Sequence, residues 1–292
     1  LWVAGTNPAV SLPELGRIRR ILDQESLFLV VSDGYLTETT AFADVVLPAA
    51  LWGEKIGSYT NTDRTVHLSE RAVAPPGEAR SDLDIWLDYA RRMGFTDRSG
   101  RPLPNWETAE EAFNAWRECS RGRPCDYSGL SYDKLRGGGG IQWPCTDDTP
   151  DGTERLYVDH HFRTDDDQCE TYGHDLATGA SVTAAEHAAQ RFDGRARLKA
   201  ADWEPPPEGP DDAYPMHLMT GRTVYHFHTR TKTGRAPELN AAAPEPWVEL
   251  APSDAAELGV ADGDLVRVES RRGAVEVTAR CVGNRPGTVF LP

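Results

Sequence analysis

The chain has 292 residues, a length that is sufficient for two domains. Its 46 acidic and 31 basic residues give a net charge of −15, which argues against non-specific binding to nucleic acid or to anionic membranes, because both require a basic surface. No stretch approaches the roughly 18 apolar residues of a membrane-spanning helix, and no signal peptide is recognisable.

The ends of the chain and its basic residues are both unusual. It opens at Leu1 and stops at Pro292, directly after a strand-like run, so we expect a fragment that is cut at both ends. The acidic excess and the preference for arginine over lysine favour a salt-adapted protein, whose surface carboxylates keep it hydrated. A GC-rich genome that encodes arginine and aspartate is the alternative explanation. The lysines are Lys55, Lys134, Lys199 and Lys232.

The cysteines and histidines form no recognisable metal site. There is no C-x-x-C pair and no histidine at zinc-ligand spacing. We expect free thiols in a reducing cytoplasm, with a disulfide or a metal site at Cys119 and Cys125 as the alternative. We expect the acidic run at 165–167 to be a solvated loop, and the histidines near it to be surface residues. The cysteines are Cys119, Cys125, Cys145, Cys169 and Cys281.

The first hundred residues alternate between short apolar runs and helical patterns. Residues 1–4 and 27–31 are typical of strands that are buried on both faces of a parallel sheet. Between them, Ser11 and Glu14 match a capping box, after which leucine and isoleucine recur at helical spacing. A third apolar run follows at 44–48. This order predicts a parallel-sheet, Rossmann-like α/β unit.

Further helices are marked by their caps. Ser81 and Gly94 bracket one helix, and Thr108 and Glu111 form a capping box before another. From about residue 119 to residue 212 the regular pattern gives way to glycine, aspartate and proline runs, which indicate loops and a linker.

The last eighty residues have a β pattern. Valines alternate with charged residues on both sides of a turn at 271–273, which predicts a half-buried antiparallel hairpin. Just before it, Ser253 can cap a short helix that ends at Gly259. We interpret this region as a small β-barrel. The predicted organisation is an α/β unit at 1–95, then a helix, loops and an insertion at 96–212, and the barrel at 213–292.

Several ordered motifs carry more specific information. Together they strongly resemble the molybdopterin-dependent oxidoreductases of the dimethylsulfoxide reductase superfamily, over residues 1–95 and 213–292. The resemblance implies an α/β unit followed by a molybdopterin dinucleotide-binding β-barrel. The motifs are SDGYLTETT at 32–40, ADVVLP at 43–48, WGEK at 52–55, PGEARSD at 76–82, TGR at 220–222, HFHT at 226–229 and DGD at 262–264.

The middle of the chain narrows the resemblance to one branch of that superfamily. It is similar to the assimilatory nitrate reductases in the motifs YSGLSYDKL at 127–135, IQWP at 141–144 and GTERLY at 152–157. In that branch a short DGRA element usually follows directly. Here it stands at 193–196, after an inserted segment at about 165–192.

The resemblance implies a bound cofactor, molybdenum held by two molybdopterin guanine dinucleotides. The cofactor would carry the oxygen-atom transfer, and the protein would supply orientation and electrostatics. We therefore expect nucleotide-binding groups in this chain, with no catalytic residue and no metal ligand. A 4Fe-4S cluster is expected only in a missing N-terminal part. The residues that match the family's cofactor-binding positions are Asn7, Ser32, Asp33, Lys55, Asp82, Thr220, Gly221, Arg222, His226, His228 and Thr229.

Five of these residues also have a simpler explanation. Ser32 and Asp33 follow a predicted strand, where ligands of open α/β sheets bind, but the same pair can cap a helix. Lys55 suits a phosphate or a solvated loop. Asp82 suits a ligand or the dipole of the helix that follows it. Arg222 offers a planar fork for phosphate oxygens, or is a surface arginine.

These observations together predict a cytoplasmic oxidoreductase fragment that is inactive on its own. The whole enzyme would reduce nitrate to nitrite in nitrate assimilation, with electrons from a low-potential donor such as ferredoxin. A formate dehydrogenase of the same superfamily is one alternative function. A non-catalytic nucleotide-binding module is another.

Overall fold

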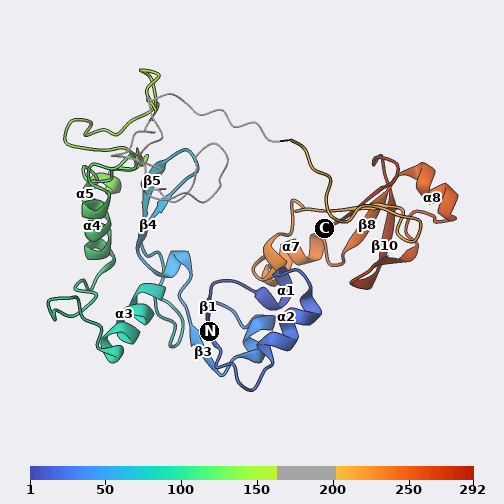
Figure 1. Cartoon of the computed structure of the whole chain (residues 1–292), viewed down its shortest axis with the longest axis horizontal. Helices are drawn as coiled ribbons and strands as arrows, with labels where there is room; N and C mark the ends of the chain where they lie inside the picture. Colours follow the sequence, from blue (N-terminus) through green and yellow to red (C-terminus); the bar gives the residue numbers. More distant parts are fainter. Residues whose placement is uncertain (163–201) are drawn as a thin grey trace. The chain divides into compact units, whose positions relative to one another are not determined.

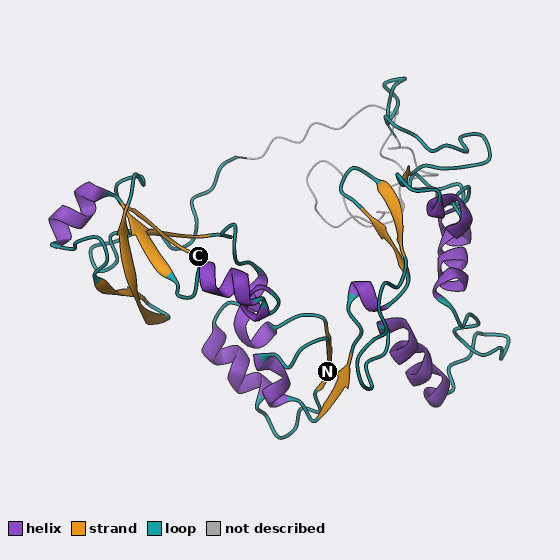
Figure 2. Ribbon diagram, turned by 180° about the vertical axis from the view of Figure 1, so that it is seen from behind, coloured by secondary structure: helices purple, strands orange, loops and turns teal. Residues whose placement is uncertain are grey.

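The computed structural model of the chain describes residues 1–162 and 202–292 (Figure 1). The predicted insertion at 165–192 and Cys169 lie outside these residues. The chain divides into two compact units. Unit 1 combines Leu1–Val46 with Trp203–Pro292, and unit 2 falls within Leu47–Asp202. Strands and helices occur in both units, as Figure 2 shows.

Unit 1 begins with a small parallel sheet. Strand β2 pairs in parallel with β1, as the two apolar runs predict, and Val3, Leu29 and Val31 are buried in its core. The strand order is β1-β2-β3. This parallel pairing is confirmed, but a sheet of this size gives only loose support for a Rossmann-like fold. The elements are β1 (Trp2–Ala4), α1 (Pro8–Ser11), α2 (Leu15–Leu22), β2 (Val30–Asp33), η1 (Glu38–Phe42) and β3 (Val45–Pro48).

The predicted capping box between β1 and α2 is wrong. Ser11 ends the short helix α1, and its hydroxyl donates to the Asn7 carbonyl at 3.0 Å. Glu14 is itself the N-cap residue of α2, with a left-handed backbone and no side-chain cap. A proline at the first position of α1 starts that helix three residues before Ser11, which leaves no room for a cap there.

The C-terminal part of unit 1 is a curled five-stranded sheet with the order β7-β11-β8-β10-β9. The predicted hairpin is present, since β9 and β10 pair antiparallel around the turn. The predicted small barrel is confirmed in part, because the described residues form half a barrel in which β7 and β9 are the two edges of the sheet. The elements are β7 (His217–Thr220), η3 (His228–Arg230), η4 (Thr233–Arg235), α7 (Pro237–Ala242), β8 (Trp247–Leu250), α8 (Pro252–Leu258), β9 (Leu265–Ser270), β10 (Gly273–Cys281) and β11 (Thr288–Leu291).

The short helix α8 partly matches its prediction. It ends at Gly259, whose positive φ of 67° is the left-handed conformation that glycine adopts most readily. Ser253 lies inside the helix, whose N-cap residue is Ala251. The helix starts earlier than predicted because Pro252 occupies the first helical position.

Unit 2 contains the capped helices that the sequence predicts. Ser81 accepts from the Asp84 amide at the start of α3, and Gly94 ends that helix with a left-handed backbone. Thr108 and Glu111 form the predicted capping box of α4. The elements are η2 (Trp52–Glu54), β4 (Gly57–Thr60), β5 (Thr65–Ser69), α3 (Asp82–Met93), α4 (Ala109–Ser120), α5 (Tyr132–Arg136) and β6 (Ile141–Gln142).

The described part of the middle segment before residue 163 is more ordered than a linker. Leu130, Tyr132 and Cys145 are buried with Val66 of β5 and Phe113 of α4, and so they form the core of unit 2. The sequence predicts mostly loops in this region because glycine and proline punctuate it. The helices and strands here are short, so they are stabilised by packing and leave no periodic pattern in the sequence. Among the helices of the described residues, none is long and apolar enough to cross a membrane.

A glycine substitution tests this core directly. A Cβ at Gly129 would lie 2.8 Å from the Thr146 carbonyl oxygen and 2.9 Å from the Cys145 backbone. We expect Gly129→Ala to destabilise unit 2 by about 1–3 kcal/mol, the usual cost of overpacking a core. Gly53→Ala, in the same unit but with nothing within 4 Å of the new Cβ, is the matched control. Urea unfolding measures both variants, and equal midpoints would contradict the prediction.

Candidate functional site

The end of strand β2 is the first part of the candidate site. Ser32 is buried, and its hydroxyl accepts from the Trp2 indole N–H at 2.8 Å. Asp33 is half-buried, and its carboxylate accepts the Tyr35 backbone N–H at 3.1 Å. Ser32 thus ties the strand ends together, while Asp33 presents the charge. The structure assigns them different tasks, which the sequence does not distinguish.

The charge on Asp33 is partly withdrawn from water. Burial raises the pKa of the Asp33 carboxyl above its usual value, and this effect exceeds the opposing ones. Backbone N–H groups of Tyr35 and Gly34, and then the positive charges of Lys232 and Arg235, act in the other direction and lower the pKa. The carboxylate therefore lies among donors that favour its ionised form, in a place where water solvates it poorly.

A segment far along the chain supplies the cations near Asp33. The guanidinium of Arg235 lies 5.1 Å from the centroid of the Tyr35 ring, and its Nη2 donates to the Leu36 carbonyl at 3.0 Å. Helix α1 also contacts η3. Three segments of unit 1 therefore converge here, namely the start of α1, the loop after β2, and η3–η4.

Asn7 lies at the start of α1, where its side chain is committed to the protein. Its Nδ2 donates to Glu38 at 2.7 Å, and its Oδ1 accepts from the Thr39 hydroxyl at 2.7 Å and from the Thr39 amide at 3.2 Å. The hydrogen bond from Asn7 is the main reason that the pKa of Glu38 is lowered. Asn7 thereby fixes η1 against the end of β1, so a direct cofactor contact remains a prediction.

The 220–229 segment follows strand β7. Thr220 ends the strand, and Gly221 packs so closely on β11 that a Cβ would lie 2.8 Å from the Phe290 ring. The Arg222 Nη2 donates to the His228 Nε2 at 2.7 Å, and its guanidinium lies 6.0 Å from the Phe227 ring centroid. The Arg222–His228 pair is exposed to solvent.

His226 has a structural place in this segment. Its Nε2 donates to the Ala243 carbonyl at 2.8 Å, because a carbonyl can only accept. In the neutral ring, Nδ1 then accepts from the buried Thr233 hydroxyl at 2.9 Å. Both ring nitrogens are therefore occupied by protein groups, so His226 braces the segment instead of offering a free donor.

The backbone around His228 is strained. His228, Thr229 and Arg230 have consecutive positive φ angles of 48°, 60° and 59°. Left-handed backbone is unfavourable for residues with a Cβ, and it concentrates at functional sites where the surrounding structure enforces it. The Thr229 hydroxyl donates to the His228 carbonyl at 2.6 Å, which stabilises this turn.

Lys55 and Asp82 belong to unit 2 and pair with each other. The Lys55 ammonium donates to the Asp82 carboxylate, and both side chains are partly exposed. Lys55 follows η2, and Asp82 is the first residue of α3. The pair holds these two elements together and keeps a positive and a negative group side by side, which suits a phosphate with an adjacent hydroxyl. Their predicted cofactor contact remains a prediction.

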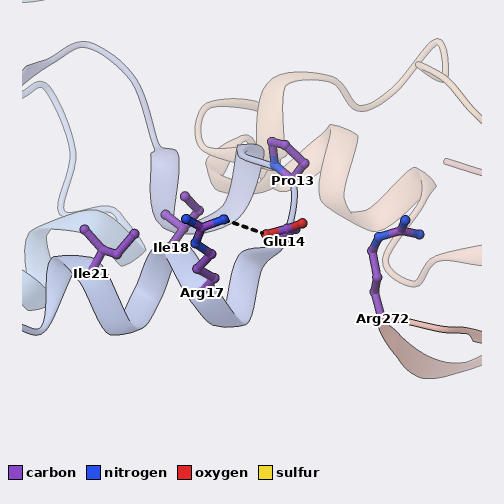
Figure 3. Close-up of a pocket in the computed structure, with 6 residues that line it drawn as sticks. All are labelled: Pro13, Glu14, Arg17, Ile18, Ile21 and Arg272. Atoms are coloured by element: carbon purple, nitrogen blue, oxygen red, sulfur yellow. Dashed lines mark hydrogen bonds and ion pairs between the residues drawn. The ribbon is translucent and has the colours of Figure 1, made fainter. Parts of the chain in front are cut away.

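A pocket beside α2 is lined by residues other than the predicted site residues. Figure 3 shows Pro13, Glu14, Arg17, Ile18 and Ile21 of the α2 region with Arg272 of the β9–β10 turn. Glu14 and Arg17 form an exposed ion pair at 3.4 Å, a kind of contact that stabilises proteins little. None of the predicted site residues lines this pocket, so we assign it no role.

The donor set of unit 1 fits a guanine dinucleotide. A guanine edge offers N–H donors, which a carboxylate such as Asp33 accepts, and the diphosphate suits the cations Arg222, Lys232 and Arg235. The Thr37 hydroxyl is buried at the end of the same loop and has no hydrogen-bond partner among the described residues. A buried hydroxyl without a partner is a free polar group at the end of this loop.

Two parts of the chain match known families. Residues 1–92 match the molybdopterin oxidoreductase family, and residues 216–292 match the molydopterin dinucleotide binding domain. Both matched regions belong to molybdopterin oxidoreductase domains. The family resemblance of the sequence motifs is thus confirmed. The matched domains indicate a molybdenum–molybdopterin cofactor and place the dinucleotide-binding region at η3–η4 and the curled sheet.

Relatives of two activities are equally similar to this chain. It is 37% identical to the F420-dependent formate dehydrogenase subunit alpha of Methanocaldococcus jannaschii, over all of this chain and 38% of that protein. It is 38% identical to the nitrate reductase of Symbiobacterium thermophilum, again over the whole chain and 36% of that protein. The assimilatory nitrate reductase catalytic subunit of Bacillus subtilis is 35% identical, over 100% of this chain and 37% of that protein. The chain thus spans less than two-fifths of their lengths.

The fold has a counterpart among solved structures. Acetylene hydratase from Pelobacter acetylenicus matches with a TM-score of 0.65 and 20% identity, over 99% of this chain and 37% of that one. At this identity the match supports the fold and says nothing about the reaction.

Sequence reasoning missed two charged residues at the site. Lys232 and Arg235 follow directly after the 220–229 segment, in the run TKTGR at 231–235. A cluster of cations next to a nucleotide-binding motif is a detectable signal. Their proximity to Asp33, by contrast, depends on a contact across about two hundred residues and cannot be read from local patterns.

The raised pKa of Asp33 predicts the direction in which its ionisation changes the stability of the fold. A carboxyl whose pKa is higher in the folded state favours folding when it is protonated, so its ionisation lowers stability at neutral and alkaline pH. We expect Asp33→Asn to leave the melting temperature equal or higher at pH 8, and this difference to shrink as the pH falls through the raised pKa.

Glu208 is the control, because its pKa is shifted in the opposite direction. Hydrogen bonds and charge from Arg272 and Arg271 lower the pKa of Glu208, so its ionised form is the stabilising one. Glu208→Gln should therefore lower the melting temperature at pH 8. Melting curves between pH 5 and 8 measure both variants, and a lower melting temperature for Asp33→Asn at pH 8 would show that its charge stabilises the fold.

Proposed function

We propose that this chain holds the nucleotide end of a molybdopterin guanine dinucleotide in a nitrate reductase. The observation that carries the proposal is the half-buried carboxylate of Asp33, which lies at the end of a parallel strand among the cations of the dinucleotide-binding segment. Open α/β sheets bind ligands at the carboxyl ends of their strands. A carboxylate with cations beside it matches a guanine joined to a diphosphate.

Each residue then has a distinct task. Asp33 accepts the guanine N–H groups, which adenine cannot supply in the same pattern. Arg222 and His228 form a donor pair for phosphate or pterin oxygens, on a strained turn that keeps them in place. Lys55 and Asp82 are proposed to bind a phosphate and a neighbouring hydroxyl. The bound molybdenum cofactor supplies the two-electron chemistry that converts nitrate to nitrite and water.

The choice of nitrate as the substrate rests on sequence similarity to nitrate reductases. The motifs at 127–135 and 141–144 resemble assimilatory nitrate reductases, and two of the relatives named above are nitrate reductases. In the structure Leu130, Tyr132 and Leu135 of the first motif are buried in the core of unit 2. They therefore reflect ancestry and do not touch a substrate. We further propose a low-potential donor such as ferredoxin, a cytoplasmic location, and a 4Fe-4S cluster on a segment outside this chain.

Formate oxidation is the second candidate. The formate dehydrogenase of M. jannaschii is as similar to this chain as the nitrate reductases are, and it covers the chain completely. The cofactor-binding residues of unit 1 serve either substrate, because both reactions would use the same nucleotide tail. A nucleotide-binding module without activity is the remaining alternative.

Guanine recognition can be tested on the 292-residue chain itself. We expect GDP to bind more tightly than ADP, and Asp33→Asn to weaken GDP binding about 10- to 100-fold, since a charge-assisted hydrogen bond contributes about 1.5–3 kcal/mol. Asp23→Asn, an exposed aspartate at the end of α2, is the matched control. Calorimetric titration measures the affinities, and equal affinities for GDP and ADP would reject Asp33 as the guanine reader.

The reaction requires the complete protein that contains this sequence. We expect it to reduce nitrate with a reduced viologen, and to lose this activity when tungstate replaces molybdate in the growth medium. In the same protein, Lys55→Ala should lower molybdenum and guanine nucleotide content together and leave the preference for nitrate over formate unchanged. Formate oxidation without nitrate reduction would establish the second candidate instead.

A further inference from the structure

We propose that Arg235 is a positioning residue, which holds the Asp33 carboxylate in its guanine-reading orientation by fixing the loop at 33–36. The proposal deepens the function above and rests on it for the identity of the ligand. The positioning itself rests only on contacts within unit 1. Nothing in the motifs at 220–229 or 32–40 assigns this role to Arg235.

The contacts of Arg235 join two distant segments. One guanidinium nitrogen, Nη2, donates to the Leu36 carbonyl at 3.0 Å, and the other, Nη1, donates to the Thr231 carbonyl at 2.6 Å. The central carbon of the guanidinium, Cζ, also lies 5.1 Å from the Tyr35 ring centroid. One side chain thus binds the loop after β2 to the turn before η4, across 199 positions of sequence.

The outer part of this loop has no buried side chain of its own at Leu36, so a contact from another segment can fix it. Ser32 and Thr37 are buried at its two ends, but Leu36 between them is 75% exposed. The Asp33 carboxylate takes its direction from this loop, because it accepts the Tyr35 backbone N–H at 3.1 Å. A shift of Tyr35 would therefore turn the carboxylate, and Arg235 contacts both Tyr35 and the residue that follows it.

The backbone that carries Arg235 is held in place by hydrogen bonds and by a buried neighbour. It ends the short helix η4, where its backbone N–H donates to the Lys232 carbonyl at 3.1 Å. Thr233, at the start of η4, is buried, and its hydroxyl pairs with the brace residue His226 at 2.9 Å. The occupied ring of His226 thereby acquires a function, because it stabilises the turn from which Arg235 reaches the loop.

The chemistry favours arginine over lysine at this position. A guanidinium is planar and carries several donors, so it can bind two carbonyls and stack on a ring at once, whereas an ammonium is a point charge. Lys232 already supplies a positive charge near Asp33. Replacing Arg235 by lysine therefore keeps the positive charge near Asp33 and removes the two carbonyl hydrogen bonds and the ring stacking.

Hydrogen exchange on the 292-residue chain tests the positioning without any ligand. We expect Arg235→Gln and Arg235→Lys to speed exchange of the Tyr35 amide about tenfold, and to weaken GDP binding by about the same factor. Exchange of the Ala279 amide, which donates to Asp264 in the curled sheet, should not change. Arg280→Gln is the control, since Arg280 also lies over an aromatic ring, 3.7 Å from the Trp247 centroid, away from the loop.

The possible results are distinct. Unchanged exchange at Tyr35 in Arg235→Gln overturns the proposal, and so does full protection in Arg235→Lys, which would show that charge alone suffices. Weaker GDP binding with unchanged exchange also overturns it, because Arg235 would then contact the ligand directly. Faster exchange in a chain whose wild type does not bind GDP supports the positioning role and rejects the proposed function.

Discussion

The partial burial of one carboxylate is the constraint on which the site depends. Asp33 loses part of its hydration at the end of β2, and the fold compensates with backbone N–H groups of its own loop and with cations from η4. The loop donors lie within two residues of Asp33, whereas the cations come from about two hundred residues away. The site therefore exists only when the two segments of unit 1 fold together.

Polar residues of the candidate site are mostly engaged with one another. Arg222 binds His228, Lys55 binds Asp82, and Asn7 binds η1. Such pairing keeps ionic groups satisfied without a ligand, at a small net energy because they are partly exposed. The strained turn at 228–230 adds rigidity, since its left-handed backbone persists only where the surrounding structure enforces it.

The two units contribute different kinds of information. Unit 1 carries the residues whose chemistry fits a guanine dinucleotide. Unit 2 carries the motifs that connect the chain to nitrate reductases, and there the motif residues Leu130 and Tyr132 are core residues. A core motif persists within a lineage because its packing is cooperative, whatever the substrate. Family membership therefore follows directly from this chain, while the distinction between nitrate and formate requires residues that touch the substrate.

The sequence by itself determined the family, the parallel strands β1 and β2, the capped helices α3 and α4, and the β9–β10 hairpin. The strands and helices follow from local patterns, namely apolar runs, capping residues and alternation, each within about a dozen residues, whereas the family follows from the resemblance of the ordered motifs. Tertiary structure alone decided the task of each polar residue. His226 became a brace because Ala243 and Thr233 took its ring nitrogens, and Arg235 met the loop after β2 through a contact 199 positions apart. No local pattern encodes which distant group will occupy a donor, because that depends on how the segments pack.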